Sequence, residues 1–197
     1  MQSIIAGFLL LALLSGCGKS GDEARFRQFQ QLLETAAVTV TAEVTALSDD
    51  AVTAFTLTCA ESPEGTSVEV LQPEMLAGVR AWLRPGETTL EFDGVALPVP
   101  DAPGQVSPLL ALPMLLEAVR TGHIDLVWRE GDALAVQLIL DDETTVRLFF
   151  NADNVPVYAE IAANDRTAVQ CAITTWMTNE GETEYESNDQ DVGRDQS

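Results

Sequence analysis

The feature that most constrains the fold is an alternation of apolar and polar residues that begins at Val38. From Val38 to Ala46 every second residue is Val or Ala, and the residues between them are Thr or Glu. A period of two predicts a β-strand with one buried face. Further short runs follow along the chain, separated by turn-forming residues such as Pro63-Glu64-Gly65 and Asp93-Gly94. This spacing predicts one antiparallel sheet of about ten strands in meander order.

Two helices are predicted beside this sheet. Asp22–Thr35 repeats apolar residues at helical spacing, and acidic residues open its first turn. A second, almost wholly apolar segment opens at Pro108, but Pro113 should interrupt it, which leaves a turn and then a helix over Pro113–Thr121. A segment that is apolar on nearly every side must be buried. We therefore expect an α+β fold, in which a curved half-barrel sheet holds this helix against its concave face.

The hollow of such a sheet is the first candidate binding site. Its lining would come from the apolar helix and from the strands that face it. The candidate residues are Leu109, Leu112, Met114, Leu115, Leu116, Trp128 and Phe150. The same residues could instead form the protein core, which is the usual place for large apolar side chains. The sequence thus leaves open whether the hollow takes a lipid or other hydrophobic ligand, or whether the Leu-rich helix fills it.

The amino-terminal segment has the pattern of a secretory signal. Ile4–Leu14 is apolar but too short to cross a bilayer, and it ends at Ser15-Gly16, directly before Cys17. This arrangement resembles the lipobox of bacterial lipoproteins, although the first residues carry no Lys or Arg. The alternative is an ordinary signal peptide with an incidental cysteine.

The lipobox resemblance implies a chemistry and a location. Residues 1–16 would be removed as a signal peptide, and Cys17 would carry a covalent diacylglyceryl group. Residues 17–21 would then form a short tether to the cell membrane, on its extracytoplasmic face. No other cofactor is expected.

The net charge of the chain decides which classes of partner remain possible. The chain has 31 acidic and 10 basic residues and a net charge of −21. This balance excludes nucleic acid, because affinity for nucleic acid comes from Lys and Arg that neutralise phosphates. It also means that the acyl anchor, and not the protein surface, would hold the chain on an anionic membrane. Residues 177–197 are polar and acidic and are expected to be a disordered tail, which leaves residues 22–176 as the folded domain.

The residues capable of catalysis or metal binding are few and scattered. Cys59 and Cys171 could form a disulfide in an exported protein, or could be two buried free thiols. His123 is the single histidine, and it lies beside a predicted helix end without a nucleophile pattern near it. Zinc sites need clustered His and Cys, which this chain lacks. We therefore expect no catalytic residues, no metal and no enzymatic activity.

Several segments together resemble the LolA/LolB half-barrel family. They are Val68–Pro73, Ala77–Val79, Leu90–Gly94, Ser107-Pro108, and Pro156 with Ala159–Ile161. The resemblance implies the half-barrel and a non-enzymatic role, since the family includes outer-membrane lipoprotein carriers and envelope lipoproteins. The chain is also similar to the GerS-type spore germination lipoproteins of clostridia, which implies a tethered cofactor that binds a cell-wall enzyme. LolA is a soluble carrier, whereas this chain has its own lipobox, which favours a tethered role over a shuttle. A carrier module for a hydrophobic ligand is the alternative.

Overall fold

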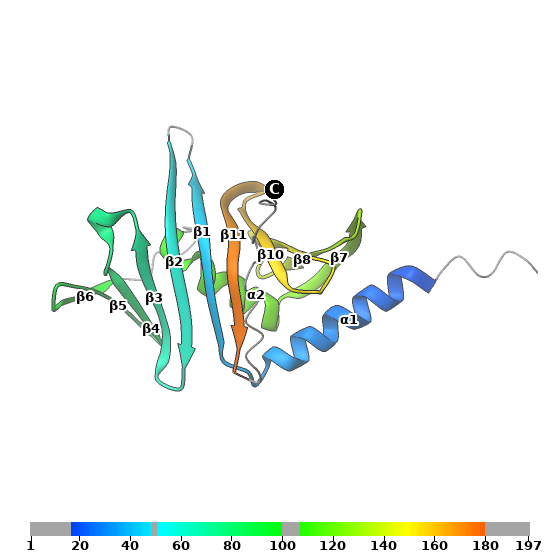
Figure 1. The fold of residues 1–197 in the computed structure, drawn as a ribbon, viewed down its shortest axis with the longest axis horizontal. Helices are drawn as coiled ribbons and strands as arrows, with labels where there is room; N and C mark the ends of the chain where they lie inside the picture. Colours follow the sequence, from blue (N-terminus) through cyan, green and yellow to red (C-terminus); the bar gives the residue numbers. More distant parts are fainter. Residues whose placement is uncertain (1–16, 49–50, 100–106, 180–197) are drawn as a thin grey trace, which may run out of the picture.

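The structure, a computed structural model, describes residues 17–48, 51–99 and 107–179. The predicted signal peptide and residues 180–197 of the predicted acidic tail lie outside the described residues. Within the described part, one open antiparallel sheet carries two α-helices and two short 3₁₀ turns (Figure 1). The α+β prediction and the half-barrel type of sheet are confirmed.

The predicted turns at Pro63-Glu64-Gly65 and Asp93-Gly94 each separate two strands, as expected. In chain order the strands are β1 (Val38–Leu47), β2 (Val52–Ser62), β3 (Gly65–Gln72), β4 (Arg80–Arg84), β5 (Glu87–Phe92), β6 (Val95–Val99), β7 (His123–Glu130), β8 (Ala133–Ile139), β9 (Thr144–Phe150), β10 (Pro156–Ala163) and β11 (Arg166–Thr178).

The sheet consists of two meanders that lie side by side. Its order is β6-β5-β4-β3-β2-β1-β11-β10-β9-β8-β7, so β1 pairs with β11 in the middle and β6 and β7 form the two edges. Val38 faces Thr178 at one end of the β1–β11 ladder, and Ala46 faces Val169 at the other. The chain must therefore cross from one edge to the other between β6 and β7. It does so through the 3₁₀ turn η2 (Pro108–Leu110) and the helix α2 (Ala111–Thr121).

The second helix differs from the prediction at Pro113. The helix α2 begins at Ala111, and Pro113 lies inside its first turn instead of starting the helix. Proline is tolerated there because the first N–H groups of a helix have no intrahelical acceptor. Gly122 ends the helix in an extended conformation, with φ −63°, and a Cβ on it would lie 2.3 Å from the Ala118 carbonyl oxygen. This glycine is therefore required by a close approach and not by a left-handed turn.

The first helix also differs in its bounds. The helix α1 spans Cys17–Leu33, so it takes in the residues that were predicted to be a tether. It packs against α2 and β7, and its amino-terminal end projects beyond the sheet on the β7 side (Figure 1). A short 3₁₀ turn, η1 (Glu74–Leu76), follows β3.

The core lies between the sheet and α2. We call the face of the sheet that α2 covers the inner face, and the opposite face the outer face. Val38, Val40, Ala42 and Val44 alternate on the inner face of β1 and are all fully buried, as the period of two predicted. The cross-strand neighbours Leu57 and Cys59 on β2 are buried on the same face. Leu148 on β9 and Ile161 on β10 are buried there too, and the register connects them to β1 through β11.

Candidate binding surfaces

The hollow of the half-barrel is filled by its own helix. Leu112 and Leu115 of α2 are fully buried, and Leu116 is 2% exposed. The helix contacts β3, β8, β10 and β11, and Phe150 closes the core from β9 at 2% exposure. Leu109 and Met114 are half-buried and pack against the same core. The sequence left open a ligand-binding hollow or a protein core, and the packing of these residues is that of a core.

Trp128 is the exception among the predicted lining residues. Its cross-strand neighbour is Ala135. Ala135 lies between Leu134 and Val136, whose side chains are on the inner face, so its own side chain points to the opposite face. Trp128 is therefore on the outer face, and its predicted place in the hollow is wrong. It packs edge-on against Phe149, with ring centroids 6.2 Å apart, and Phe149 packs against Tyr158 at 5.7 Å. Both phases of β7 carry apolar residues, so the sequence pattern alone could not assign the face.

An aromatic cluster joins α1 to the inner face. The ring of Phe29 lies 5.3 Å from that of Phe150 and 5.9 Å from that of Trp176, measured between centroids. Phe26 is 1% exposed and meets Phe150 edge-on at 5.9 Å. Each such pair adds about 0.5–1.5 kcal/mol beyond the buried area. These contacts hold the helix that carries Cys17 at its amino-terminal end.

Arg120 connects four elements at one end of the core. Its Nε donates to the Leu33 carbonyl at 2.8 Å, and its Nη2 donates to the Ala36 carbonyl at 3.0 Å and to Glu61 Oε2 at 2.5 Å. The same Glu61 oxygen accepts the Val38 backbone N–H at 2.9 Å. The hydrogen bond to Glu61 raises the pKa of Arg120 further above its ordinary value. We call this group of contacts the Arg120 clamp. It ties α2 to the end of α1, the start of β1 and the end of β2.

Cys59 and Cys171 are free thiols, and the disulfide alternative is not formed. The register explains why. Cys59 faces Val40 and Cys171 faces Val44, on opposite sides of β1. The two cysteines are two strands apart, at about 4.8 Å per strand, and are staggered by four residues, at about 3.3 Å per residue. Their Cα atoms therefore lie far beyond the limit of about 7 Å for a disulfide. Burial raises the pKa of each thiol to about 12.

A set of apolar side chains on the inner face is left uncovered near β6. Buried Val68 faces Ala81, Ala81 faces Leu90, and Leu90 faces Leu97, so these residues share the inner face. Phe92 and Val95 face each other one step further along and lie on the same side. Yet Phe92, Val95 and Leu97 are 50%, 59% and 61% exposed.

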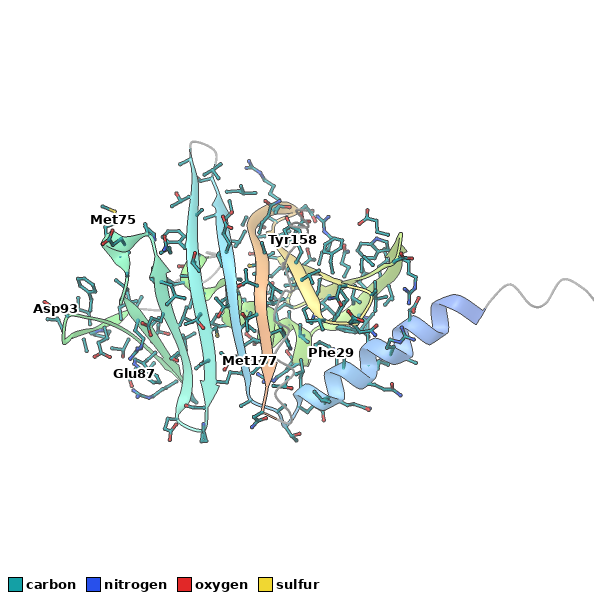
Figure 2. The ribbon with its side chains drawn as sticks, viewed as in Figure 1. Phe29, Met75, Glu87, Asp93, Tyr158 and Met177 are labelled. Carbon is teal, nitrogen blue, oxygen red and sulfur yellow. The ribbon has the colours of Figure 1, made fainter. Side chains whose placement is uncertain are left out.

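The short turn η1 lies at the same end of the sheet as these residues. The backbone carbonyl of Leu76 accepts a hydrogen bond from the Val79 backbone N–H at 3.1 Å. Because Arg80 pairs with Glu91, the preceding residue Val79 lies next to Phe92. Met75, beside it, is 81% exposed and lies at the same end of the sheet as the β5–β6 turn (Figure 2). We call Met75, Leu76, Phe92, Val95 and Leu97 the apolar shelf. None of them was among the predicted site residues, because each reads as an ordinary strand or turn residue until the sheet order shows that β6 is an edge.

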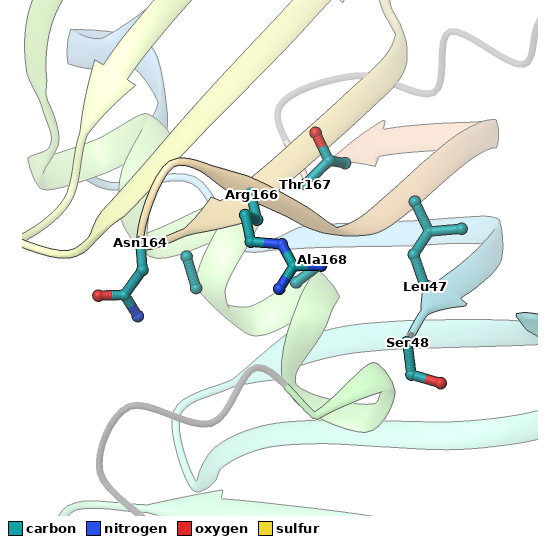
Figure 3. A pocket seen from close by; sticks show the side chains of 7 residues that line it. Leu47, Ser48, Asn164, Arg166, Thr167 and Ala168 are labelled. Atoms are coloured by element: carbon teal, nitrogen blue, oxygen red, sulfur yellow. The ribbon is translucent and has the colours of Figure 1, made fainter. Parts of the chain in front are cut away.

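A pocket of about 450 Å³ lies elsewhere, between the end of β1 and the β10–β11 turn. Leu47, Ser48, Asn164 and Thr167 line it, and Arg166 reaches between Asn164 and Leu47 (Figure 3). It is wide open and contains none of the predicted site residues. Among the described residues no group of His, Cys, Asp and Glu is arranged to hold a metal. His123 is exposed at the start of β7. No helix of the described chain is long and apolar enough to cross a membrane.

Comparison with known proteins yields similarities among solved structures. No family model matches the chain, and no curated protein matches it. A LolA superfamily protein from Nitrosomonas europaea superposes with a TM-score of 0.42 at 10% identity, over 79% of this chain and 92% of that one. A putative outer membrane lipoprotein-sorting domain from Vibrio parahaemolyticus also gives 0.42, at 8% identity, over 85% and 96%. The complex of the CwlD amidase with the GerS lipoprotein from Clostridioides difficile gives 0.42 at 13% identity, over 94% and 100%.

These are the kinds of protein that the sequence resembles. With TM-scores below 0.5 and identities near one tenth, nothing about function follows from them for this chain.

Proposed function

We propose that this chain is a lipid-anchored, extracytoplasmic protein without enzymatic activity of its own, which acts by binding another protein of the cell envelope. The anchor is the diacylglyceryl group on Cys17, left as the first residue after removal of residues 1–16. The binding role is of the GerS kind, a tethered cofactor for a cell-wall enzyme, with sporulation or germination as the candidate process.

One observation carries this proposal. A carrier needs a hollow that stays open for its cargo, but α2 places Leu112, Leu115 and Leu116 in the hollow with 0–2% exposure. Burial of this degree is typical of side chains in a protein core. At the same time apolar residues stay exposed on the inner face, and exposed apolar patches mark interaction surfaces. A filled hollow beside an uncovered patch favours protein binding over carriage.

The test is purification of the full chain from its own cells in mild detergent. We expect it to elute with one envelope protein in a fixed ratio, and the pair to survive a second, orthogonal column. A chain that elutes alone, or with lipid only, would contradict the proposal. Membrane retention is scored in the same preparation, with Cys17→Ala as the variant that should leave the membrane fraction.

A second function is supported by the position of the exposed patch. The shelf residues Phe92, Val95 and Leu97 lie on the inner face next to Leu90, which packs against the core, so a hydrophobic ligand could lie along them. On this alternative, a purified domain would carry a lipid whose occupancy falls when a shelf residue is made charged.

A further inference from the structure

We propose that the apolar shelf is the docking site for the protein partner, and that the partner presents apolar side chains edged by Arg or Lys. This inference rests on the proposed function and names the surface that carries it out. Among the described residues twelve large apolar side chains are exposed, and five of them gather at this one end of the sheet. Such a concentration is typical of an interaction surface. Interfaces commonly place such residues at the centre of a polar rim.

The charge around the shelf selects the partner's chemistry. Glu74 directly precedes Met75, Asp93 directly follows Phe92, and both carboxylates are exposed. The cation nearest in the register is already engaged, since Arg80 Nη2 bonds Glu69 Oε2 at 2.5 Å. That pair holds the pKa of Arg80 above its ordinary value. The rim is therefore acidic in a chain of net charge −21. It attracts a basic protein surface and repels anionic lipid headgroups.

The position of the shelf also favours a protein. Cys17 begins α1 at one end of the molecule, whereas β6 and η1 lie at the opposite end along the longest axis (Figure 1). With Cys17 held at the bilayer, the shelf is the part of the domain that faces away from the membrane. A partner in the envelope reaches it there, while the lipids around the anchor do not.

The edge strand β6 indicates how the partner binds. Pro98 lies within β6 and has no backbone N–H to donate. Prolines occur on edge strands, where they weaken pairing with another strand. Addition of a long partner strand to this edge would leave an acceptor without its donor. Docking through side chains on the inner face of β5 and β6 is the mode that fits.

The experiment places a photo-crosslinking amino acid at position 97 of the full chain in its own cells. The matched control is position 126: Leu126 is 50% exposed on β7, the opposite edge strand. We expect light to give one protein adduct from position 97 and none from position 126. The captured protein is then purified and titrated against wild type, Leu97→Glu and Leu126→Glu.

The expected titration results are specific. Leu97→Glu should weaken binding at least tenfold, and Leu126→Glu should stay within about twofold of wild type, since peripheral side chains contribute little. Val95→Glu is the second shelf variant, with folding of each checked by circular dichroism. Glu74→Gln with Asp93→Asn should slow association at low salt and flatten its salt dependence.

The outcomes separate this inference from the proposed function. If a partner co-purifies with wild type but crosslinks from position 126 instead of position 97, the shelf is not its binding site, although the proposed function stands. The same conclusion follows if the partner still binds Leu97→Glu. A lipid adduct at position 97, or an adduct of twice the chain mass, overturns the shelf as the docking site too. If no protein co-purifies and none crosslinks from either position, the proposed function fails as well.

Discussion

At the scale of single residues, we expect the Arg120 clamp to make the largest contribution to the stability of the fold. The guanidinium of Arg120 donates hydrogen bonds to the carbonyls of Leu33, at the end of α1, and of Ala36, in the turn that follows. It also neutralises Glu61, whose side chain is 14% exposed. Groups buried to this degree are costly to leave without a partner. The clamp is also what fixes α2 at the carboxyl end that leads into β7.

Replacement of Arg120 by Met should therefore lower the free energy of unfolding by about 3 kcal/mol, because Glu61 stays half-buried without its cation. Denaturant titration measures the loss, and Arg120→Met combined with Glu61→Gln should recover part of it. The control is Arg27→Met, which removes an exposed pair with Glu23 and should cost less than about 0.5 kcal/mol. Equal losses in Arg120→Met and Arg27→Met would mean that the clamp does not stabilise the fold.

The two buried thiols give a prediction about pH. Their pKa of about 12 in the folded chain lies above the value for an unfolded cysteine, so the folded state holds the protons longer. The stabilisation is complete below about pH 8.5 and is lost as the pH rises toward 12. Unfolding titrations between pH 8 and 11 should show this decline, and Cys59→Ala with Cys171→Ala should reduce it. Below pH 9 a thiol reagent should label both residues only after unfolding, and rapid labelling of the native protein would contradict their burial.

Residue assignments were the least predictable part of the site. The period of two on β1 placed Val38 and Val40 inward correctly, because Thr and Glu between them settle the phase. On β7 no such contrast exists, and Trp128 was assigned to the wrong face. The separation of Cys59 from Cys171 depends on which strands flank β1, and that pairing is not encoded in local spacing.

At the scale of elements, α2 packs its apolar side chains against the inner face of the sheet. Leu115→Ala should lower the free energy of unfolding by about 2–5 kcal/mol, since the side chain is fully buried and the sheet cannot collapse onto the space. Leu32→Ala on α1 is the matched change at a 44% exposed position and should cost well under that. Similar small losses from both would indicate that the hollow is loosely packed and open to a ligand.

The end of β11 gives a second prediction at this scale. Thr178 pairs with Val38, and the backbone N–H and side chain of Asn179 bond the Ala37 carbonyl and N–H at 3.1 and 3.0 Å. A chain that ends at Asn179 should keep the melting temperature of the full chain within about one degree, since it retains these contacts. A chain that ends at Trp176 loses them and should melt several degrees lower. Equal melting temperatures for the two truncations would show that this ladder end contributes nothing.

Most elements were predictable because their signals are local. Asp93 and Gly94 both adopt positive φ, 49° and 77°, as the two-residue hairpin between β5 and β6 requires. The start of α2 differs from the prediction because Pro113 lies within the first turn, where a helix tolerates proline, and not in the helix interior, where proline breaks it. The extension of α1 back to Cys17 was missed since Gly18 and Gly21 lower helix propensity.

At the scale of the whole molecule, the pairing of β1 with β11 organises the rest. It turns two meanders into one sheet, sends α2 across the inner face, and leaves β6 as an edge with the apolar shelf on it. Sequence periodicity predicted the strands but not this junction, so it could not reveal which apolar residues stay uncovered. The shelf is a property of the topology.

The anchor is tested at the same scale. Cys17→Ala should move the protein from the membrane fraction to the soluble fraction, because several acyl chains at about 0.8 kcal/mol per buried CH₂ supply the binding. Carbonate washing followed by immunoblotting measures the distribution. A variant that stays in the washed pellet would mean that Cys17 is not the anchor.

The most direct test of the account is native mass spectrometry of the chain from Gly18 onward, purified from bacteria. We predict the bare mass of the polypeptide with both thiols reduced, because α2 fills the hollow and Cys59 and Cys171 lie too far apart to bridge. A lipid bound in fixed ratio, and lost when Leu115 or Leu97 is replaced by a charged residue, would contradict the account and identify the protein as a carrier.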